Sequence, residues 1–218
     1  MIFHLVRPLV LLSTMLTVSA YAGGNAIPSK DGMQNAESGY VTLDTGLKQL
    51  RVDFNTHASD VRLVFIVSGT CPECLRGMDD MGKALAVEQA NPKLRIYVIY
   101  VPKLGAQAKD IQPTISLLPG KHVYRYWDPA GVSGRRFSYT LKIGQYAWDV
   151  WMIYGRGQQW GKELPPKPDF WMHQLYGLPS WRYLNIDTFV KEVKTYLTQS
   201  KTAEAQKSDA ARHAVGAP

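Results

Sequence analysis

The sequence predicts an α/β domain with a central mixed sheet flanked by helices. Two apolar runs, Val61 to Val67 and Leu94 to Val101, are rich in β-branched and aromatic residues, as buried strands are. A segment of helical periodicity separates them, and strand, helix and strand in this order form a right-handed crossover unit. A third strand-like run, Trp148 to Tyr154, ends at the turn signal Gly155-Arg156-Gly157.

The first half of the domain is expected to begin with a strand or hairpin over Gly39 to Phe54, ahead of the strand Val61 to Val67. A helix should then run from Pro72 to about Ala90, because Pro72 suits a first-turn position, where a missing N–H costs nothing. Asn91-Pro92 ends this helix before the next strand. The apolar positions at helical spacing are Cys74, Leu75, Met78, Met81 and Leu85.

The second half alternates in the same way. Gly105 to Leu118 is weakly helical, His122 to Trp127 is a short strand, and Gly131 to Ile143 is a helix. The last helix is expected over Ile186 to Leu197, with Asn185 or Asp187 as its cap. Its apolar face consists of Phe189, Val193, Tyr196 and Leu197.

The N-terminus has the pattern of a secretory signal peptide. Arg7 precedes a short apolar core from Leu9 to Val18, and Ala20-Tyr21-Ala22 supplies the small-x-small cleavage pattern. We expect cleavage after Ala22, a domain over residues 23–200, and a disordered tail over 201–218, which has too little apolar content to pack. The apolar core is shorter than the ~20 residues of a spanning helix, so the mature protein should be periplasmic or secreted and not integral to a membrane.

Charge argues against a nucleic-acid partner. The chain has a formal net charge of +7, and removal of residues 1–22 takes away one basic residue and no acidic one. The remaining charge is spread along the chain, with Arg135-Arg136 as the longest basic run and no basic stripe interleaved with aromatics. We therefore expect the positive charge to serve solubility.

The two cysteines of the chain form the motif Cys71-Pro72-Glu73-Cys74 directly after a predicted buried strand. Cys71 should lie at a helix N-terminus, where free N–H groups and the helix dipole favour a thiolate, and Cys74 lies about one turn further on. Residues three apart share a helix face at a spacing that a disulfide can bridge. The pair can therefore cycle between dithiol and disulfide.

An exported chain in which Cys-Pro-x-Cys begins a helix between two parallel strands resembles the thioredoxin-fold thiol–disulfide oxidoreductases. The resemblance covers Val61 to Tyr154, with Ile186 to Leu197 matching the closing helix. It implies that Cys71 is the nucleophile and Cys74 the resolving cysteine, that no cofactor is needed, and that the substrates are exported proteins with thiols or disulfides. A membrane-bound or soluble redox partner would supply or accept the electrons.

Three features depart from that family. The loop that usually carries a cis-proline has Tyr146 or Ala147 in its place, so we expect trans geometry and an altered substrate groove. Phe65 replaces the buried acid that many thioredoxins have six residues before the first cysteine. The third departure is an aromatic, proline-rich insertion that extends from Trp160 to Tyr183.

Asp149 lies in the middle of an apolar strand. It is either an outward-facing or capped acid or a replacement proton acceptor for Cys74.

The residues between the cysteines are expected to tune the redox pair. Pro72 sets the helix start, and the Glu73 carboxylate opposes thiolate formation at both sulfurs. A less stabilised thiolate gives a less oxidising disulfide, so Glu73 favours disulfide reduction or exchange over strong oxidation.

Two alternatives to thiol–disulfide chemistry remain. Cys71 and Cys74 could hold a soft metal such as Cu(I), with Met78, Met81 and His173 as further ligands, which would make this a copper-handling protein. The pair could instead be a structural disulfide in an interaction module. The aromatic residues of the insertion either staple a long loop across the sheet or form a groove wall beside Cys71.

Overall fold

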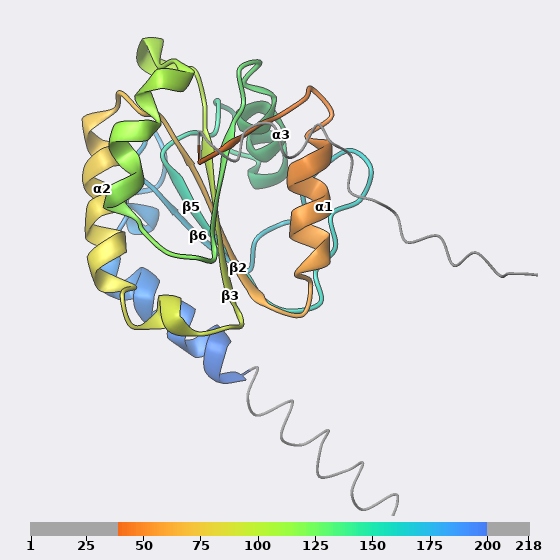
Figure 1. The fold of residues 1–218 in the computed structure, drawn as a ribbon, viewed down its shortest axis with the longest axis vertical. Coiled ribbons are helices and arrows are strands. Elements are labelled where there is room, and N and C mark those ends of the chain that lie inside the picture. The colour runs from red at the N-terminus through yellow and green to blue at the C-terminus, as the bar shows by residue number, and fades with distance from the viewer. Residues whose placement is uncertain (1–38, 200–218) are drawn as a thin grey trace, which may run out of the picture.

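The computed structural model of this protein describes residues 39–199, which are drawn in colour in Figure 1. The expected signal peptide, its cleavage site after Ala22 and the expected tail over 201–218 lie outside these residues.

A single mixed sheet of six strands forms the centre of the described part, in the order β1-β4-β3-β2-β5-β6. The first four strands in this order are parallel, whereas β5 is antiparallel to β2 and β6 is antiparallel to β5. The strands are β1 (Val41–Thr42), β2 (Val61–Val67), β3 (Leu94–Tyr100), β4 (Val123–Trp127), β5 (Val150–Tyr154) and β6 (Phe170–His173). Strands β2, β3 and β5 therefore confirm the three expected apolar strands.

Strand β2 can lie at the centre of the sheet because its faces are apolar apart from Arg62, whose buried guanidinium donates to the carbonyl oxygens of Phe54, Gly155 and Gln158. All seven of its residues are buried, and alternate side chains enter different cores. Leu63 and Phe65 pack with one layer of helices, whereas Val64 and Ile66 pack with the other.

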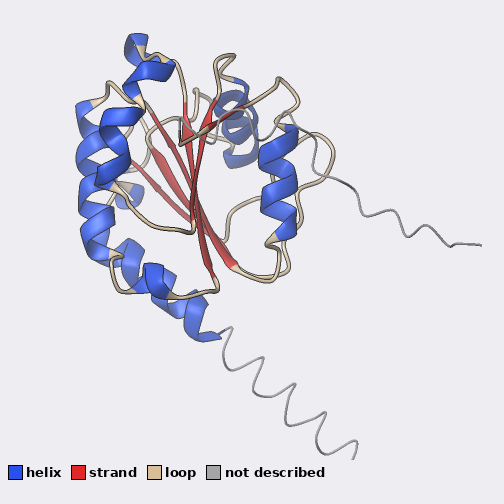
Figure 2. Ribbon diagram, viewed as in Figure 1, coloured by secondary structure: helices blue, strands red, loops and turns tan. Residues whose placement is uncertain are grey.

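Helices cover both faces of the sheet (Figures 1 and 2). Helix α2 (Pro72–Ala84) and a final helix over residues 186–199 cover one face, and α1 (Lys48–Thr56) and α3 (Val132–Leu141) cover the other. Asn185 caps the final helix, as expected, because its Oδ1 accepts a hydrogen bond of 2.8 Å from the Thr188 N–H. The unit β2-α2-β3, the antiparallel β5 and β6 and the closing helix make a thioredoxin-like fold, which confirms the expected fold class.

The expected strand or hairpin over Gly39 to Phe54 is wrong for most of its length. Only Val41 and Thr42 form a strand, and α1 follows. Leu50 and Phe54 are four residues apart on one helix face and are buried together with Leu47, the residue that precedes the helix.

Two further segments are shorter or tighter than expected. Helix α2 ends at Ala84, and a separate 3₁₀ turn, η3 (Glu88–Ala90), takes up the rest of the expected length. The weakly helical segment before β4 consists of three 3₁₀ turns, η4 (Lys103–Gly105), η5 (Ala108–Asp110) and η6 (Gln112–Leu117).

The aromatic segment between β5 and the final helix is partly a strand. It contains β6 and the 3₁₀ turn η7 (Ser180–Arg182). Trp160 and Trp171 are buried in the core on the α1 side, whereas Trp181 is 71% exposed. The Arg182 guanidinium lies 4.5 Å from the Trp171 ring centre and 4.3 Å from that of Trp181. The rings of Trp160 and Trp171 therefore anchor the segment in the core, whereas the ring of Trp181 stays at the surface.

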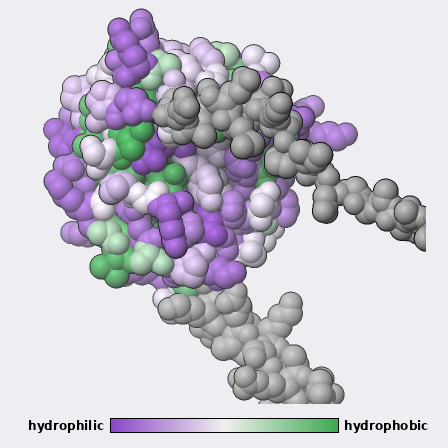
Figure 3. Space-filling view, in the orientation of Figure 1, coloured by the Kyte–Doolittle hydropathy of each residue, from purple (hydrophilic) through white to green (hydrophobic). Residues whose placement is uncertain are grey.

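The surface in Figure 3 is mainly hydrophilic on the side shown, with apolar side chains in small patches between polar ones. Within residues 39–199, no helix has the length and apolar character needed to cross a membrane.

Candidate functional site

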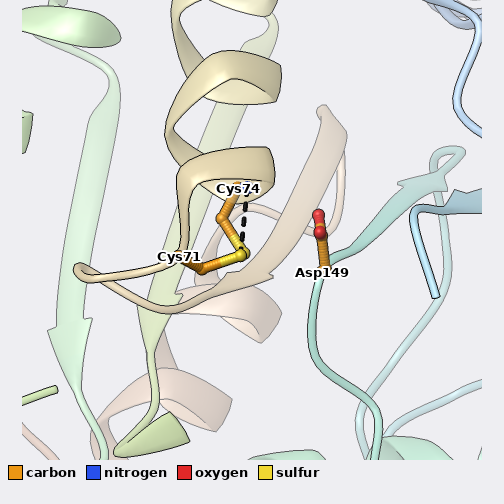
Figure 4. A group of neighbouring side chains, drawn as sticks. All are labelled: Cys71, Cys74 and Asp149. Atoms are coloured by element: carbon orange, nitrogen blue, oxygen red, sulfur yellow. Dashed lines mark hydrogen bonds between the residues drawn. The ribbon is translucent and has the colours of Figure 1, made fainter. Parts of the chain in front are cut away.

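The two cysteines lie where β2 passes into α2. Cys71 is the N-cap residue of the helix, with an extended backbone, and Pro72 is its first helical residue. The Cys71 Sγ accepts a hydrogen bond of 3.3 Å from the Cys74 backbone N–H, which Figure 4 shows as a dashed line. The sulfur thus takes the place of the oxygen in an ordinary N-cap, and this contact favours a thiolate at Cys71.

Both cysteines are free thiols, and both are buried, with Cys71 4% exposed and Cys74 fully enclosed. A hydrogen bond from the Cys74 thiol, together with that from the Cys74 N–H, lowers the pKa of Cys71 in spite of its burial. Burial and the same thiol contact raise the pKa of Cys74. The expected division of roles, in which Cys71 is the more acidic sulfur, agrees with these directions.

Asp149 lies beside the two sulfurs. One Asp149 carboxylate oxygen and the two Sγ atoms all lie within 4.8 Å of one another, and the Asp149 side chain is 2% exposed. Figure 4 shows this carboxylate projecting from the start of β5 next to the first turn of α2. The structure contradicts an outward-facing acid, whereas a capped acid and a proton acceptor for Cys74 both agree with this position.

The backbone and a tryptophan hold Asp149 in this position. Its φ of +51° lies in the left-handed region, which aspartate tolerates better than most residues. The Trp151 Nε1–H donates to the Asp149 Oδ1 at 3.3 Å, and the Gln174 N–H of the neighbouring chain segment donates to the Asp149 carbonyl oxygen at 3.0 Å.

Burial raises the pKa of Asp149 to about 6, although hydrogen bonds from Cys74 and Trp151 act in the opposite direction. The positive charge of Arg76 also acts to lower this pKa, although its guanidinium forms an ion pair with Glu73. The negative charge of Asp149 also raises the pKa of both thiols. Asp149 therefore lies next to the Cys74 thiol and has a proton affinity higher than that of an exposed aspartate.

Phe65 and Trp151 pack against each other next to Asp149, which directly precedes β5. Phe65 faces Trp151 across the β2–β5 pairing, with ring centres 4.7 Å apart, and is fully buried. The position expected to lack an acid is thus filled by a ring that supports the indole bound to Asp149. Sequence analysis did not identify Trp151 or Gln174 as part of the site, because their role depends on the pairing of β5 with β2 and β6.

The loop before β5 has trans geometry, as expected, since residues 39–199 contain no cis peptide bond. The Ala147 N–H donates to the Gly134 carbonyl, and the Tyr146 hydroxyl donates to the Gly131 carbonyl at 3.0 Å. These contacts fix the loop to α3. The Lys103 ammonium lies 5.3 Å from the Tyr146 ring centre and 5.4 Å from that of Trp148.

Lys103 also contacts Ser68, in the loop between β2 and Cys71. Its carbonyl oxygen accepts a hydrogen bond of 2.8 Å from the Ser68 hydroxyl. Lys103 therefore links the loop before α2 to the loop before β5, a connection that the sequence pattern did not indicate.

Glu73 differs from its expected role in one respect. Its side chain is 45% exposed and forms an ion pair with Arg76 one turn further along α2. The positive partner and the nearby solvent both weaken the effect of this carboxylate on the sulfurs. The buried acid at Asp149, rather than Glu73, is the negative charge that acts on the pair.

Of the extra copper ligands considered from the sequence, His173 does not join the two sulfurs, whereas Met78 and Met81 belong to the same buried cluster as the cysteines. The His173 Nε2 contacts the Pro179 carbonyl at 3.1 Å, and its Nδ1 accepts the Leu175 N–H at 3.1 Å, so both ring nitrogens are engaged. Met78 and Met81 are buried in the core behind α2, and the Tyr100 hydroxyl lies 4.0 Å from the Met78 Sδ. Among His, Cys, Asp and Glu in the described part, the third potential ligand is Asp149.

A groove of about 480 Å³ runs beside the start of α2. Its lining includes Gly69, Leu75 and Arg76 on the α2 side and Asp110, Pro113 and Leu117 from the 3₁₀ turns. The aromatic segment contributes no residue to it, so this groove does not have the aromatic wall considered for the insertion.

No family model matches this chain, and no curated protein matches it. Among solved structures, it is similar to a secreted Mycobacterium tuberculosis disulfide oxidoreductase homologous to E. coli DsbE, with 14% identity, a TM-score of 0.43 and coverage of 66% of this chain and 85% of that one. A thiol:disulfide interchange protein of the thioredoxin family from Chlorobium tepidum has 13% identity, a TM-score of 0.46 and coverage of 65% and 83%. Arabidopsis thaliana ScoI, solved with copper bound, has 9% identity, a TM-score of 0.40 and coverage of 65% and 86%. At these identities the likeness is one of fold alone.

Proposed function

We propose that this protein is an exported thiol–disulfide oxidoreductase that reduces or exchanges disulfides in other exported proteins. The observation that supports this most directly is the free Cys71–Cys74 pair at the start of α2, with one buried carboxylate beside both sulfurs. A structural bridge would need no acid at that place.

The reaction has two steps. The Cys71 thiolate attacks one sulfur of the substrate disulfide, which forms a mixed disulfide and releases the other substrate sulfur as a thiolate. Cys74 then loses its proton and attacks the Cys71 Sγ, which releases the second substrate sulfur and leaves a Cys71–Cys74 disulfide. Two electrons pass to the substrate, and an external dithiol must return them before the next cycle.

Asp149 is the proposed proton acceptor for Cys74. The carboxylate is within 4.8 Å of the Cys74 Sγ and lies in a buried site where few other bases can reach. Its place at the start of β5 compensates for the missing acid at Phe65. Protonated Asp149 can return the proton to the departing substrate thiolate or to solvent.

Net reduction or exchange is the proposed direction. The negative charge of Asp149 raises the already high pKa of Cys74 and limits the lowering of the Cys71 pKa, whereas strong oxidants stabilise their reduced form. The signal-peptide pattern of the first 22 residues supports export to the periplasm or the exterior, where a membrane or soluble dithiol protein would act as the reductant.

Copper handling is the second candidate, supported by two adjacent thiols of the kind that Cu(I) prefers. The engaged ring nitrogens of His173 weaken it. The same sample can decide between the two candidates.

The deciding measurement is the reduction potential of the Cys71–Cys74 pair in glutathione or dithiothreitol buffers, with bound copper assayed alongside. A potential between roughly −120 and −270 mV in copper-free protein supports the oxidoreductase. A pair that resists reduction below about −300 mV indicates a structural bridge and overturns the proposal, and stoichiometric copper retained through purification favours the second candidate.

A further inference from the structure

We propose that the reduced protein binds one thiophilic divalent ion, with zinc as the fitting example, through Cys71 Sγ, Cys74 Sγ and one carboxylate oxygen of Asp149. The site uses the sulfurs of the proposed oxidoreductase but requires no disulfide substrate. Zinc binding therefore tests it independently of the reduction potential.

The spacing of the three ligand atoms suits a small ion. They lie within 4.8 Å of one another. Zinc bonds of about 2.3 Å to sulfur and about 2.0 Å to oxygen place the ligands of a tetrahedral ion about 3.5 to 4 Å apart. Side-chain adjustments of the order of 1 Å therefore close the site around an ion, and the fourth position is left for water, as in open zinc sites.

The ligands are held in place before any ion binds. Cys71 is fixed as the helix N-cap by its contact with the Cys74 N–H. Asp149 is fixed by the Trp151 Nε1–H and by the Gln174 N–H, in a left-handed conformation that turns its side chain toward the sulfurs. Little conformational entropy is lost on binding, which raises the affinity of the site.

The local charge also favours a cation. Two thiolates and a carboxylate would bring three negative charges into a buried space, where the charge of Arg76 offsets that of Asp149 only in part, since burial still raises the Asp149 pKa. The nearby Arg76 is engaged by Glu73 at the surface. A divalent ion supplies the missing positive charge and displaces the two thiol protons to solvent, so its affinity should increase with pH.

The donor set distinguishes zinc from monovalent copper. Zinc accepts thiolate and carboxylate ligands together, whereas Cu(I) is selected by thiolates and thioethers. Asp149 adds to the affinity for zinc and little to that for Cu(I). A bound zinc ion would occupy both thiolates and so block exchange, a consequence that rests on the proposed function.

The test is a zinc titration of reduced, metal-free full-length protein in competition with a chromophoric chelator, with Co²⁺ as a spectroscopic probe. We expect one equivalent of zinc, and sulfur-to-cobalt charge-transfer and tetrahedral ligand-field bands for Co²⁺. Asp149→Asn and Asp149→Ala should weaken zinc binding by at least about tenfold, since loss of a direct ligand costs at least as much as loss of an outer partner. Protein oxidised to the Cys71–Cys74 disulfide should bind none at the site.

Asp79→Asn is the matched control, because Asp79 lies on α2 and pairs with Lys83 at the surface. It should bind zinc like the unmodified protein, and circular dichroism should show that every variant is folded. The proposal is overturned if the reduced protein takes up no stoichiometric zinc, or if folded Asp149 variants retain the affinity of the unmodified chain. Neither outcome changes the reduction potential that tests the oxidoreductase.

Discussion

The Trp151 indole joins the acid of the candidate site to the helix that carries the sulfurs. Its Nε1–H donates to the Asp149 Oδ1 at 3.3 Å, and its ring lies so close to α2 that a methyl group on Gly77 would come within 2.6 Å of it. The separation between carboxylate and thiols is therefore set by helix packing as well as by the turn before β5. This relationship makes several properties of the site testable.

The close packing of α2 on Trp151 can be tested by adding a methyl group at Gly77. Gly77→Ala is expected to destabilise the protein by about 1 to 3 kcal/mol, because the added methyl meets the Trp151 ring and the Gln174 side chain. Gly161→Ala is the control, since nothing lies within 4 Å of the added group, and its effect should stay within about 0.5 kcal/mol. Urea unfolding of both variants measures the difference. Equal stability of the two would mean that α2 does not pack tightly on Trp151.

The covalent intermediate should depend on which cysteine is removed. Cys74→Ala is expected to accumulate mixed disulfides at Cys71, because the resolving sulfur is absent, whereas Cys71→Ala should accumulate none through the enclosed Cys74. Non-reducing gels and mass spectrometry of protein expressed with its export signal would detect the adducts. Adducts on both variants, or on neither, would contradict the assigned roles.

Resolution of the mixed disulfide should need Asp149. Asp149→Asn is expected to slow this step about tenfold or more, because the amide cannot take the Cys74 proton. In the unmodified protein the rate should rise as pH increases through about 6, the pKa to which burial raises Asp149, and the variant should lack this rise. Acid quenching of a Cys71–glutathione adduct gives the rates. A variant with an unchanged rate and pH profile would remove Asp149 from the mechanism.

The free energy of unfolding should depend on pH because of the raised pKa of Asp149. The pKa of Asp149 rises from 3.8 to about 6 on folding, so between these pH values the folded protein holds a proton that the unfolded chain has lost. The free energy of unfolding should therefore fall by about 2 to 3 kcal/mol as pH rises from about 4 to about 6, and then level off. Asp149→Asn should remove this fall, and Asp79→Asn should not. Urea titrations of reduced protein with a chelator present make the comparison.

The reduction potential should respond to the buried acid more than to the acid within the motif. Glu73→Gln is expected to shift it by less than about 10 mV, because Arg76 and solvent already offset that charge. Asp149→Asn should make the potential less negative by about 30 mV, since the amide oxygen can still accept a hydrogen bond while the opposing charge is gone. A larger effect from Glu73→Gln would restore the importance first assigned to that residue.

The sequence predicts the central strands well because their mostly apolar composition directly indicates buried strands. Strands β2, β3 and β5 are apolar runs, interrupted by Arg62 in β2 and Arg95 in β3, and the structure buries every residue of β2 and β5. Short amphipathic elements are harder. Within helix α1 only Leu50 and Phe54 are buried, and β6 is four residues long within a segment rich in aromatics and proline.

The candidate site, too, could be predicted from the sequence only in part. Cys71 and Cys74 are recognisable because they are adjacent in the chain and follow a strand. The contact with Asp149 depends on the antiparallel register of β2 and β5, in which Phe65 faces Trp151, and no local pattern specifies that register. The expectation that Glu73 acts on the sulfurs was weakened by an ion pair that forms only on the helix surface.

The β2–β5 pairing has a consequence for how the protein matures. A chain that has formed β2, α2 and β3 but has not yet added β5 already contains both thiols, yet it lacks the carboxylate and the indole that surround them in the finished domain. The thiols of such an intermediate would keep the contact between Cys71 and the helix N-terminus, but they would react without the opposing charge of Asp149 and the enclosure by Trp151. Thiol reactivity followed during refolding would therefore report the moment at which the sheet is completed.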